Sequence, residues 1–124
     1  MTSKCLPADF ADLAPFLDWA LPSADERQTR RRTASRADLK AFYDALLPRI
    51  EAILRVVDAY PLGSLPADLA PLYHMALSLA EVAPHIELYG GAPGVPYAFD
   101  ETRFVAVHGQ QDTALGLPPT AAAA

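Results

Sequence analysis

The sequence has a single cysteine, Cys5, two lysines and six glycines among its 124 residues. One thiol excludes an internal disulfide, so we expect a reducing compartment and place the protein in the cytoplasm. The N-terminal residues MTSKCLPADF lack the apolar segment of a secretory signal. No apolar run approaches the roughly 20 residues of a membrane-spanning helix, so we also expect no membrane partner.

The sequence also lacks the short motifs that mark common catalytic and nucleotide-binding sites. It contains no G-x-S-x-G, no G-x-G-x-x-G, no Walker motif and no H-E-x-x-H. Residues 90–94, GGAPG, are glycine-rich, but the lysine and hydroxyl residue that end a phosphate-binding loop are missing. We therefore expect neither catalysis nor a cofactor.

Apolar residues are abundant. They make up 52% of the chain and charged residues 20%, which is typical of a folded domain rather than a disordered chain. The length suits one domain. We assign residues 1–107 to a single helical domain with a C-terminal arm, and residues 108–124, which show no useful periodicity, to a disordered tail. The many Ala, Arg, Leu and Pro residues are typical of a bacterial protein from a GC-rich genome.

Apolar residues spaced by three and four predict helices along most of the chain. Residues 6–21 predict an N-terminal helix. The capping box Ser23–Glu26 begins a second helix, which we extend unbroken over residues 24–60 with a bend at Pro48. The alternative is that a second capping box, Ser35–Asp38, restarts the helix.

The short turn at residues 61–64, PLGS, predicts that the next helix returns antiparallel. That helix spans residues 66–89. The predicted fold class is therefore all-α, an antiparallel helical hairpin of helices 24–60 and 66–89. An N-terminal helix packs against this hairpin, and an irregular C-terminal arm follows it.

Five arginines fall within residues 27–36, RQTRRRTASR, of a chain with a formal net charge of -5. Nucleic-acid binding is disfavoured, because no aromatic residue interleaves the arginines and their side chains point in several directions on a helix. The simplest interpretation is a solvated helix face. The third interpretation of these arginines is that Arg31, Arg32 and Arg36 dock on an acidic surface of a partner protein.

The helix over residues 66–89 carries a polar stripe formed by His74, Ser78, Glu81 and His85. At about 100° per residue these four fall within a band roughly 60° wide. The interpretation we favour is that the stripe is the solvent-exposed face of the helix, because charged residues are rarely fully buried.

Two other interpretations of the polar stripe remain open. In one, the stripe faces inward and Arg49 pairs with Glu81 or Glu87 in a buried polar network. In the other, His74, Glu81 and His85 bind a metal or perform acid–base chemistry. The spacing argues against one metal shared by all three, since of these residues only Glu81 and His85 stand at i and i+4.

The rest of this helix is apolar around its circumference, which is typical of a helix that is covered on most sides. We therefore expect a non-catalytic protein that acts through protein–protein association, as an accessory subunit of a larger enzyme or as a homodimer. Leu77, Leu79 and, in the arm, Phe104 are the expected apolar interface residues. The alternative function is a small helical protein that binds a ligand or metal through His74, Glu81 and His85.

Overall fold

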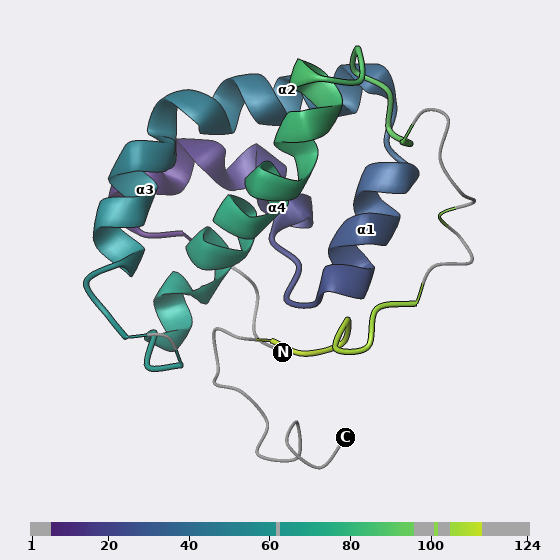
Figure 1. Ribbon diagram of the computed structural model, residues 1–124. Helices are drawn as coiled ribbons and strands as arrows, with labels where there is room; N and C mark the ends of the chain where they lie inside the picture. The colour runs from purple at the N-terminus through teal and green to yellow at the C-terminus, as the bar shows by residue number, and fades with distance from the viewer. Residues whose placement is uncertain (1–5, 62, 96–100, 102–104, 113–124) are drawn as a thin grey trace.

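The structure, a computed structural model, describes residues 6–61, 63–95, 101 and 105–112. These residues form helices joined by turns, with no strand among them, which confirms the all-α fold class (Figure 1). In chain order the elements are the 3-10 helix η1 (Ala8–Trp19), α1 (Ala24–Arg32), α2 (Arg36–Leu46), η2 (Leu47–Arg49), α3 (Ile50–Val57), η3 (Ala67–Leu69) and α4 (Ala70–Glu87).

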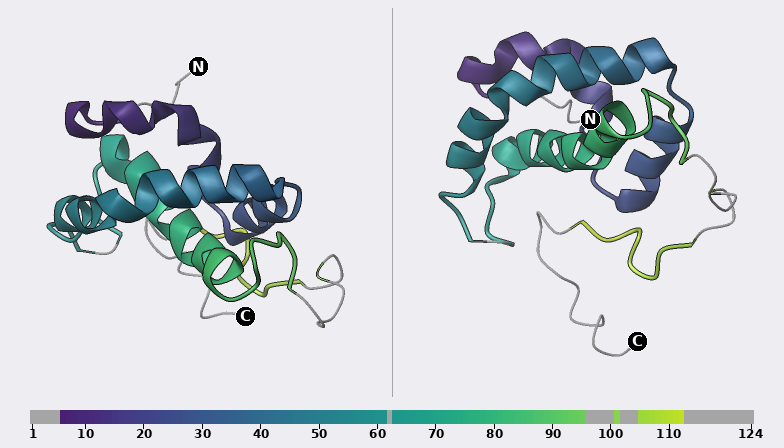
Figure 2. Two further views of the ribbon diagram at one scale, coloured as in Figure 1. Left: turned by 90° about the horizontal axis from the view of Figure 1, so that it is seen from above. Right: turned by 45° about the horizontal axis from the view of Figure 1, so that its top comes forward.

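Helix α4 lies at the centre and contacts α1, α2, α3 and η1. In the right view of Figure 2, η1 lies above α4 and residues 105–112 lie below it. Trp19 of η1 stacks on Phe42 of α2 with ring centroids 4.5 Å apart. The large side chains that are fully buried at the centre of this arrangement are Phe42, Leu39, Leu46, Ile53, Leu72, Met75 and Val82.

The unbroken helix expected over residues 24–60 is wrong. The chain leaves the helical conformation at Thr33–Ser35, and α2 starts from the second capping box. The Ser35 hydroxyl accepts a hydrogen bond from the Asp38 N–H at 3.0 Å. This bond satisfies a donor that has no partner within a helix that begins there, so the break costs little. It separates the arginine-rich α1 from the amphipathic α2.

The interruption expected at Pro48 is present. Helix α2 ends at Leu46, a single 3-10 turn follows as η2, and α3 begins at Ile50. Proline has no N–H to donate to the preceding turn, and its ring crowds that turn.

The N-terminal helix exists, but it is a 3-10 helix of 12 residues, Ala8–Trp19. A 3-10 helix has three residues per turn, so side chains three apart lie on one face. Phe10, Leu13, Phe16 and Trp19 are spaced in this way, and all but Phe16, which is half-buried, are buried. The face that packs on the core therefore fits a period of three better than a period of 3.6.

The third predicted helix divides into η3 and α4, and Pro84 lies within α4 without ending it. After Glu87 the chain turns through Gly90, whose φ is 63°, and the Gly91 N–H donates to the His85 carbonyl at 2.7 Å. Among the described helices, none has the length and apolar character that crossing a bilayer requires.

Residues 105–112 form turns without a regular element and pass the N-terminal end of α1, as the yellow segment of Figure 1 shows. The Asp25 N–H of α1 donates to the Gly109 carbonyl at 3.0 Å. Residues 108–112, which we assigned to the tail, therefore contact the helical body. The remainder of the predicted tail lies outside the described residues.

Candidate functional site

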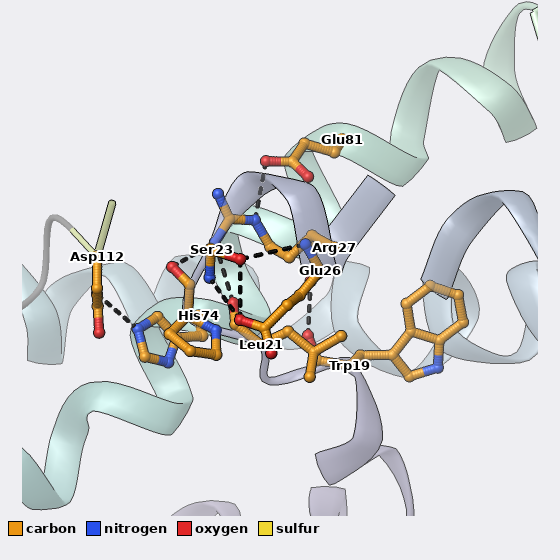
Figure 3. Close-up of polar contacts among 10 residues, drawn as sticks. Trp19, Leu21, Ser23, Glu26, Arg27, His74, Glu81 and Asp112 are labelled. Carbon is orange, nitrogen blue, oxygen red and sulfur yellow. Dashed lines mark hydrogen bonds and ion pairs between the residues drawn. The ribbon is translucent and has the colours of Figure 1, made fainter. Parts of the chain in front are cut away.

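Arg27 is almost fully buried and joins three segments of the chain. Its Nε donates to Glu81 Oε2 at 3.0 Å, and its Nη1 donates to the carbonyls of Leu21 and Pro22, both at 3.0 Å (Figure 3). The guanidinium therefore ties the connection between η1 and α1 to the side of α4. The expectation that this arginine lies on a solvated helix face is wrong.

Arg31, one turn further along α1, binds the chain that follows α4. Its Nη2 lies 2.5 Å from Glu101 Oε2, and its Nη1 donates to the Pro93 carbonyl. Burial alone would raise the pKa of Glu101, but the hydrogen bond and charge of Arg31, with the Val95 N–H, hold that pKa below its ordinary value. Arg31 is 7% exposed, so it is not available for the partner surface that we expected it to dock.

Arg30 and Arg36 also form contacts within the protein. Arg30 stacks over Trp19 at 4.0 Å from the ring centroid and pairs with Asp18 at 2.7 Å. Arg36 donates to the Gly90 carbonyl at 2.7 Å. Arg32 is half-buried, and its buried Nε has no hydrogen-bond partner among the described residues. The cluster is thus built into the fold, which agrees with the predicted lack of strong nucleic-acid binding; that prediction itself stays untested.

The polar stripe of α4 faces inward, so the solvent-exposed face that we favoured is wrong. His74, Ser78 and His85 are 6%, 2% and 5% exposed. The Ser78 hydroxyl donates to the Trp19 carbonyl at 2.6 Å, and His74 Nε2 lies 3.0 Å from Asp112 Oδ1 (Figure 3). Ser78 has its partner in η1, His74 in the segment 105–112, and His85 in the turn after α4, where Nδ1 contacts the Ala92 carbonyl. These contacts satisfy the requirement for burying polar groups.

A polar network therefore exists, but it is not the expected one. Glu81, whose side chain is 39% exposed, pairs with Arg27 rather than Arg49. Arg49 pairs with Asp12 at 2.6 Å and donates to the Asp9 carbonyl at 2.7 Å, with 29% of its side chain exposed. The physical reason is position: Arg49 follows the Pro48 turn and faces η1, whereas α1 packs against the Glu81 side of α4.

The three candidate metal ligands have separate partners. His74 contacts Asp112, Glu81 contacts Arg27, and His85 Nδ1 lies 2.9 Å from the Ala92 carbonyl. Burial lowers the pKa of His85 below its ordinary value, with Arg31 adding to the effect. Within the described part of the chain, no group of three or more His, Cys, Asp or Glu side chains is placed to hold a metal ion.

The opposite side of α4 forms an apolar groove with α3, which we call the α3–α4 groove. Its volume is about 380 Å³. Leu47 and Leu54 in its wall are 44% and 41% exposed, which is high for leucines. The residues that line the groove are Leu47, Ile50, Leu54, Val57, Asp58, Tyr73, Ala76, Leu77, Leu79, Ala80 and Ala83.

The expected interface residues fall on different sides of the boundary between core and surface. Leu77 is half-exposed in the α3–α4 groove. Leu79 also lines the groove, but it is only 4% exposed and belongs to the core of this chain, so it is not accessible as the interface residue that we expected. Phe104 lies outside the described residues.

Sequence reasoning missed the groove itself. Ala76, Ala80 and Ala83 follow one another at spacings of four and three, which places three small side chains on one side of α4. Opposite them, Leu47 and Leu54 are spaced by seven, so they share a side of the α2–α3 segment. The combination of a small-residue line with a neighbouring leucine pair is the signal that could have predicted a hollow there.

The groove and the buried polar network are the features of the described part of the chain on which a functional argument can rest. No protein-family model matches the chain, and no curated protein or solved structure matches it either.

Proposed function

We propose that this protein is a non-catalytic helical protein that acts by binding another polypeptide through the α3–α4 groove. The observation that carries the proposal is the groove itself, about 380 Å³ in volume and walled by half-exposed leucines. Exposed apolar residues that gather in one concave strip mark interaction sites. A groove between two helices suits the apolar face of a third helix, a common mode of recognition.

The two sides of α4 support this choice. The polar side is covered by α1 and by residues 105–112, whereas no described segment covers the α3–α4 groove. A helix that is apolar on most sides is normally covered on those sides. We therefore infer that the groove is completed by another chain, and we extend the proposal to an accessory subunit of a larger enzyme in a bacterial cytoplasm. Self-association into a homodimer is the other form of the same function.

The experiment compares groove variants for two kinds of association. Self-association is followed by light scattering over a range of protein concentrations. Binding of a labelled amphipathic helical peptide with a leucine strip is followed by fluorescence anisotropy. Leu54→Glu, in the groove, should remove whichever association the wild-type chain shows. Leu88→Glu, which alters a residue that is 74% exposed outside the groove, should leave it intact.

The proposal is contradicted if the wild-type chain stays monomeric and binds no such peptide up to about 1 mM, where the binding free energy is about -4 kcal/mol. It is also contradicted if Leu54→Glu and Leu88→Glu weaken association equally, since the groove would then have no special part in it.

A further inference from the structure

The α3–α4 groove has one acidic residue in its lining, Asp58, and a second, Glu87, one helical turn beyond the last lining residue of α4. Asp58 lines it beside Tyr73 at the end of α3. At the other end Glu87 follows Ala83 by one helical turn on the same side of α4. Glu87 is exposed and accepts a hydrogen bond from the Tyr43 hydroxyl at 2.5 Å. An apolar strip therefore runs between two carboxylates.

Neither carboxylate is neutralised within the described part of the chain. No described side chain forms an ion pair with Asp58 or Glu87. Other exposed acids of the α2–α3 segment differ, because Asp44 pairs with Lys40 and Glu51 pairs with Arg55.

The hydrogen bond from Tyr43 adds no positive charge at the Glu87 end. The bond and the negative charge of Glu87 instead raise the pKa of the Tyr43 hydroxyl, so that it stays neutral and donating. The two ends of the groove are therefore sites of uncompensated negative charge.

On these observations, and resting on the proposed function, we propose that the occupant of the α3–α4 groove is a basic amphipathic helix of another protein. Its apolar face would lie on the alanines of α4 and the leucines of the groove wall, and a lysine or arginine at each end would face Asp58 and Glu87. From Tyr73 to Glu87 the groove side of α4 is about 21 Å long at 1.5 Å per residue, which matches a helix of about four turns.

The line of small residues suits a helix in particular. Ala76, Ala80 and Ala83 bring the surface of α4 close to its backbone, so a second helix can approach along them. Leu47 and Leu54 rise beside this line and would pack against the flank of the occupant. The groove thus offers a floor and one wall, with charge at both ends to fix the register.

A second copy of this chain fits the groove less well. Two copies related by a two-fold axis would bring an acidic end of one groove against an acidic end of the other, whichever way the axis runs. Each copy also carries a formal net charge of -5. Like charges placed opposite each other weaken association.

The chain's own C-terminal sequence does not supply the required charges either. Residues 113–124, TALGLPPTAAAA, contain no lysine or arginine, and the Pro118–Pro119 pair disfavours a helix there. Residues 113–124 are therefore not the basic occupant of the groove.

The test uses two synthetic peptides with the same leucine strip, one flanked by lysines and one by glutamates. Each labelled peptide is titrated with the full-length protein, and binding is followed by anisotropy. We expect the lysine-flanked peptide to bind about tenfold more tightly, since two weak attractions replace two weak repulsions. The preference should shrink as salt is raised, because exposed charge pairs are screened.

Charge reversal of the groove ends sharpens the test. Asp58→Lys and Glu87→Lys should each reduce the preference, and together they should invert it. Asp9→Lys is the matched control, because it changes the net charge equally at an exposed residue of η1 that does not line the groove. Circular dichroism confirms that each variant stays helical.

The outcomes separate this inference from the proposed function. Equal binding of the two peptides, abolished by Leu54→Glu, would overturn the basic helix and leave the groove as a binding site. Dimerisation through the groove that neither peptide disrupts would overturn it in favour of a second copy. If neither peptide binds and the chain stays monomeric, the proposed function fails together with this inference.

Discussion

The two sides of α4 contrast in a way that inverts the usual rule for polar and apolar residues. On one side His74, Ser78 and His85 are buried, and on the other Ala80 is exposed and Leu77 half-exposed. The polar side is buried because η1, the turn after α4 and the segment 105–112 each bring a hydrogen-bond partner to one of these three groups. The apolar side needs no specific partner atom, so it can remain accessible in the lone chain.

The largest difference in stability is expected between two leucine-to-glutamate replacements, one in the core and one in the groove. Leu79→Glu places a carboxylate in the core, where Leu79 is 4% exposed. We expect a loss of at least about 4 kcal/mol, enough to unfold the chain, because an unpaired charge would be buried. Leu54→Glu, in the groove, should change stability by about 0.5 kcal/mol or less. Urea unfolding followed by circular dichroism measures both, and equal losses would mean that the groove is part of the core.

The second largest effect concerns Arg27 on the polar side. Arg27→Ala removes an ion pair and two hydrogen bonds to carbonyls. We expect a loss of about 2 kcal/mol, below the cost of breaking a fully buried pair because Glu81 can regain water. Arg55→Ala is the control, since its pair with Glu51 is exposed and contributes about 0.5 kcal/mol or less. Similar urea midpoints for the two variants would show that the network does not hold α1 on α4.

A smaller effect is expected where the segment 105–112 crosses α1. A Cβ added at Gly109 would lie 2.1 Å from Asp25 Oδ1, so Gly109→Ala must displace one of the two segments. Because Asp25 can shift its side chain, we expect a loss of only about 1 kcal/mol. The Asp25 amide, which donates to the Gly109 carbonyl, should exchange with solvent faster. Gly94→Ala, whose Cβ would meet Glu101 at an ordinary 3.6 Å, should leave this amide protected.

The smallest effect concerns the pH dependence of the polar side. Burial holds the pKa of His85 below its ordinary value of 6.5, so the unfolded chain binds this proton more readily. The contribution of His85 to stability is therefore complete above pH 6.5 and is lost as the pH falls through the folded-state pKa. His85→Gln should make the urea midpoint less dependent on pH over this window. An unchanged slope would show that His85 is not buried in solution.

The local structure of this chain was determined by the sequence over short distances. The Ser23 and Ser35 capping boxes act within four residues and set where α1 and α2 begin. Pro48 interrupts the helix through its own missing N–H. The spacing of three from Phe10 to Trp19 carries the signal for a 3-10 helix, although a period of 3.6 was assumed there. The break after α1 could also have been predicted from the sequence, since the second capping box, Ser35–Asp38, is visible there.

Tertiary structure decided that the polar side of α4 is buried and that an apolar side lines the groove. Arg27 and Glu81 are 54 residues apart, and each could have found other partners along the chain. The periodicity of α4 places His74 and Ser78 on one side without saying what covers that side. The cover depends on where α1 and residues 105–112 pack, and burying a polar group is favourable only when that packing supplies its partner. The groove likewise exists because α3 and α4 lie side by side, leaving leucines and alanines facing one hollow.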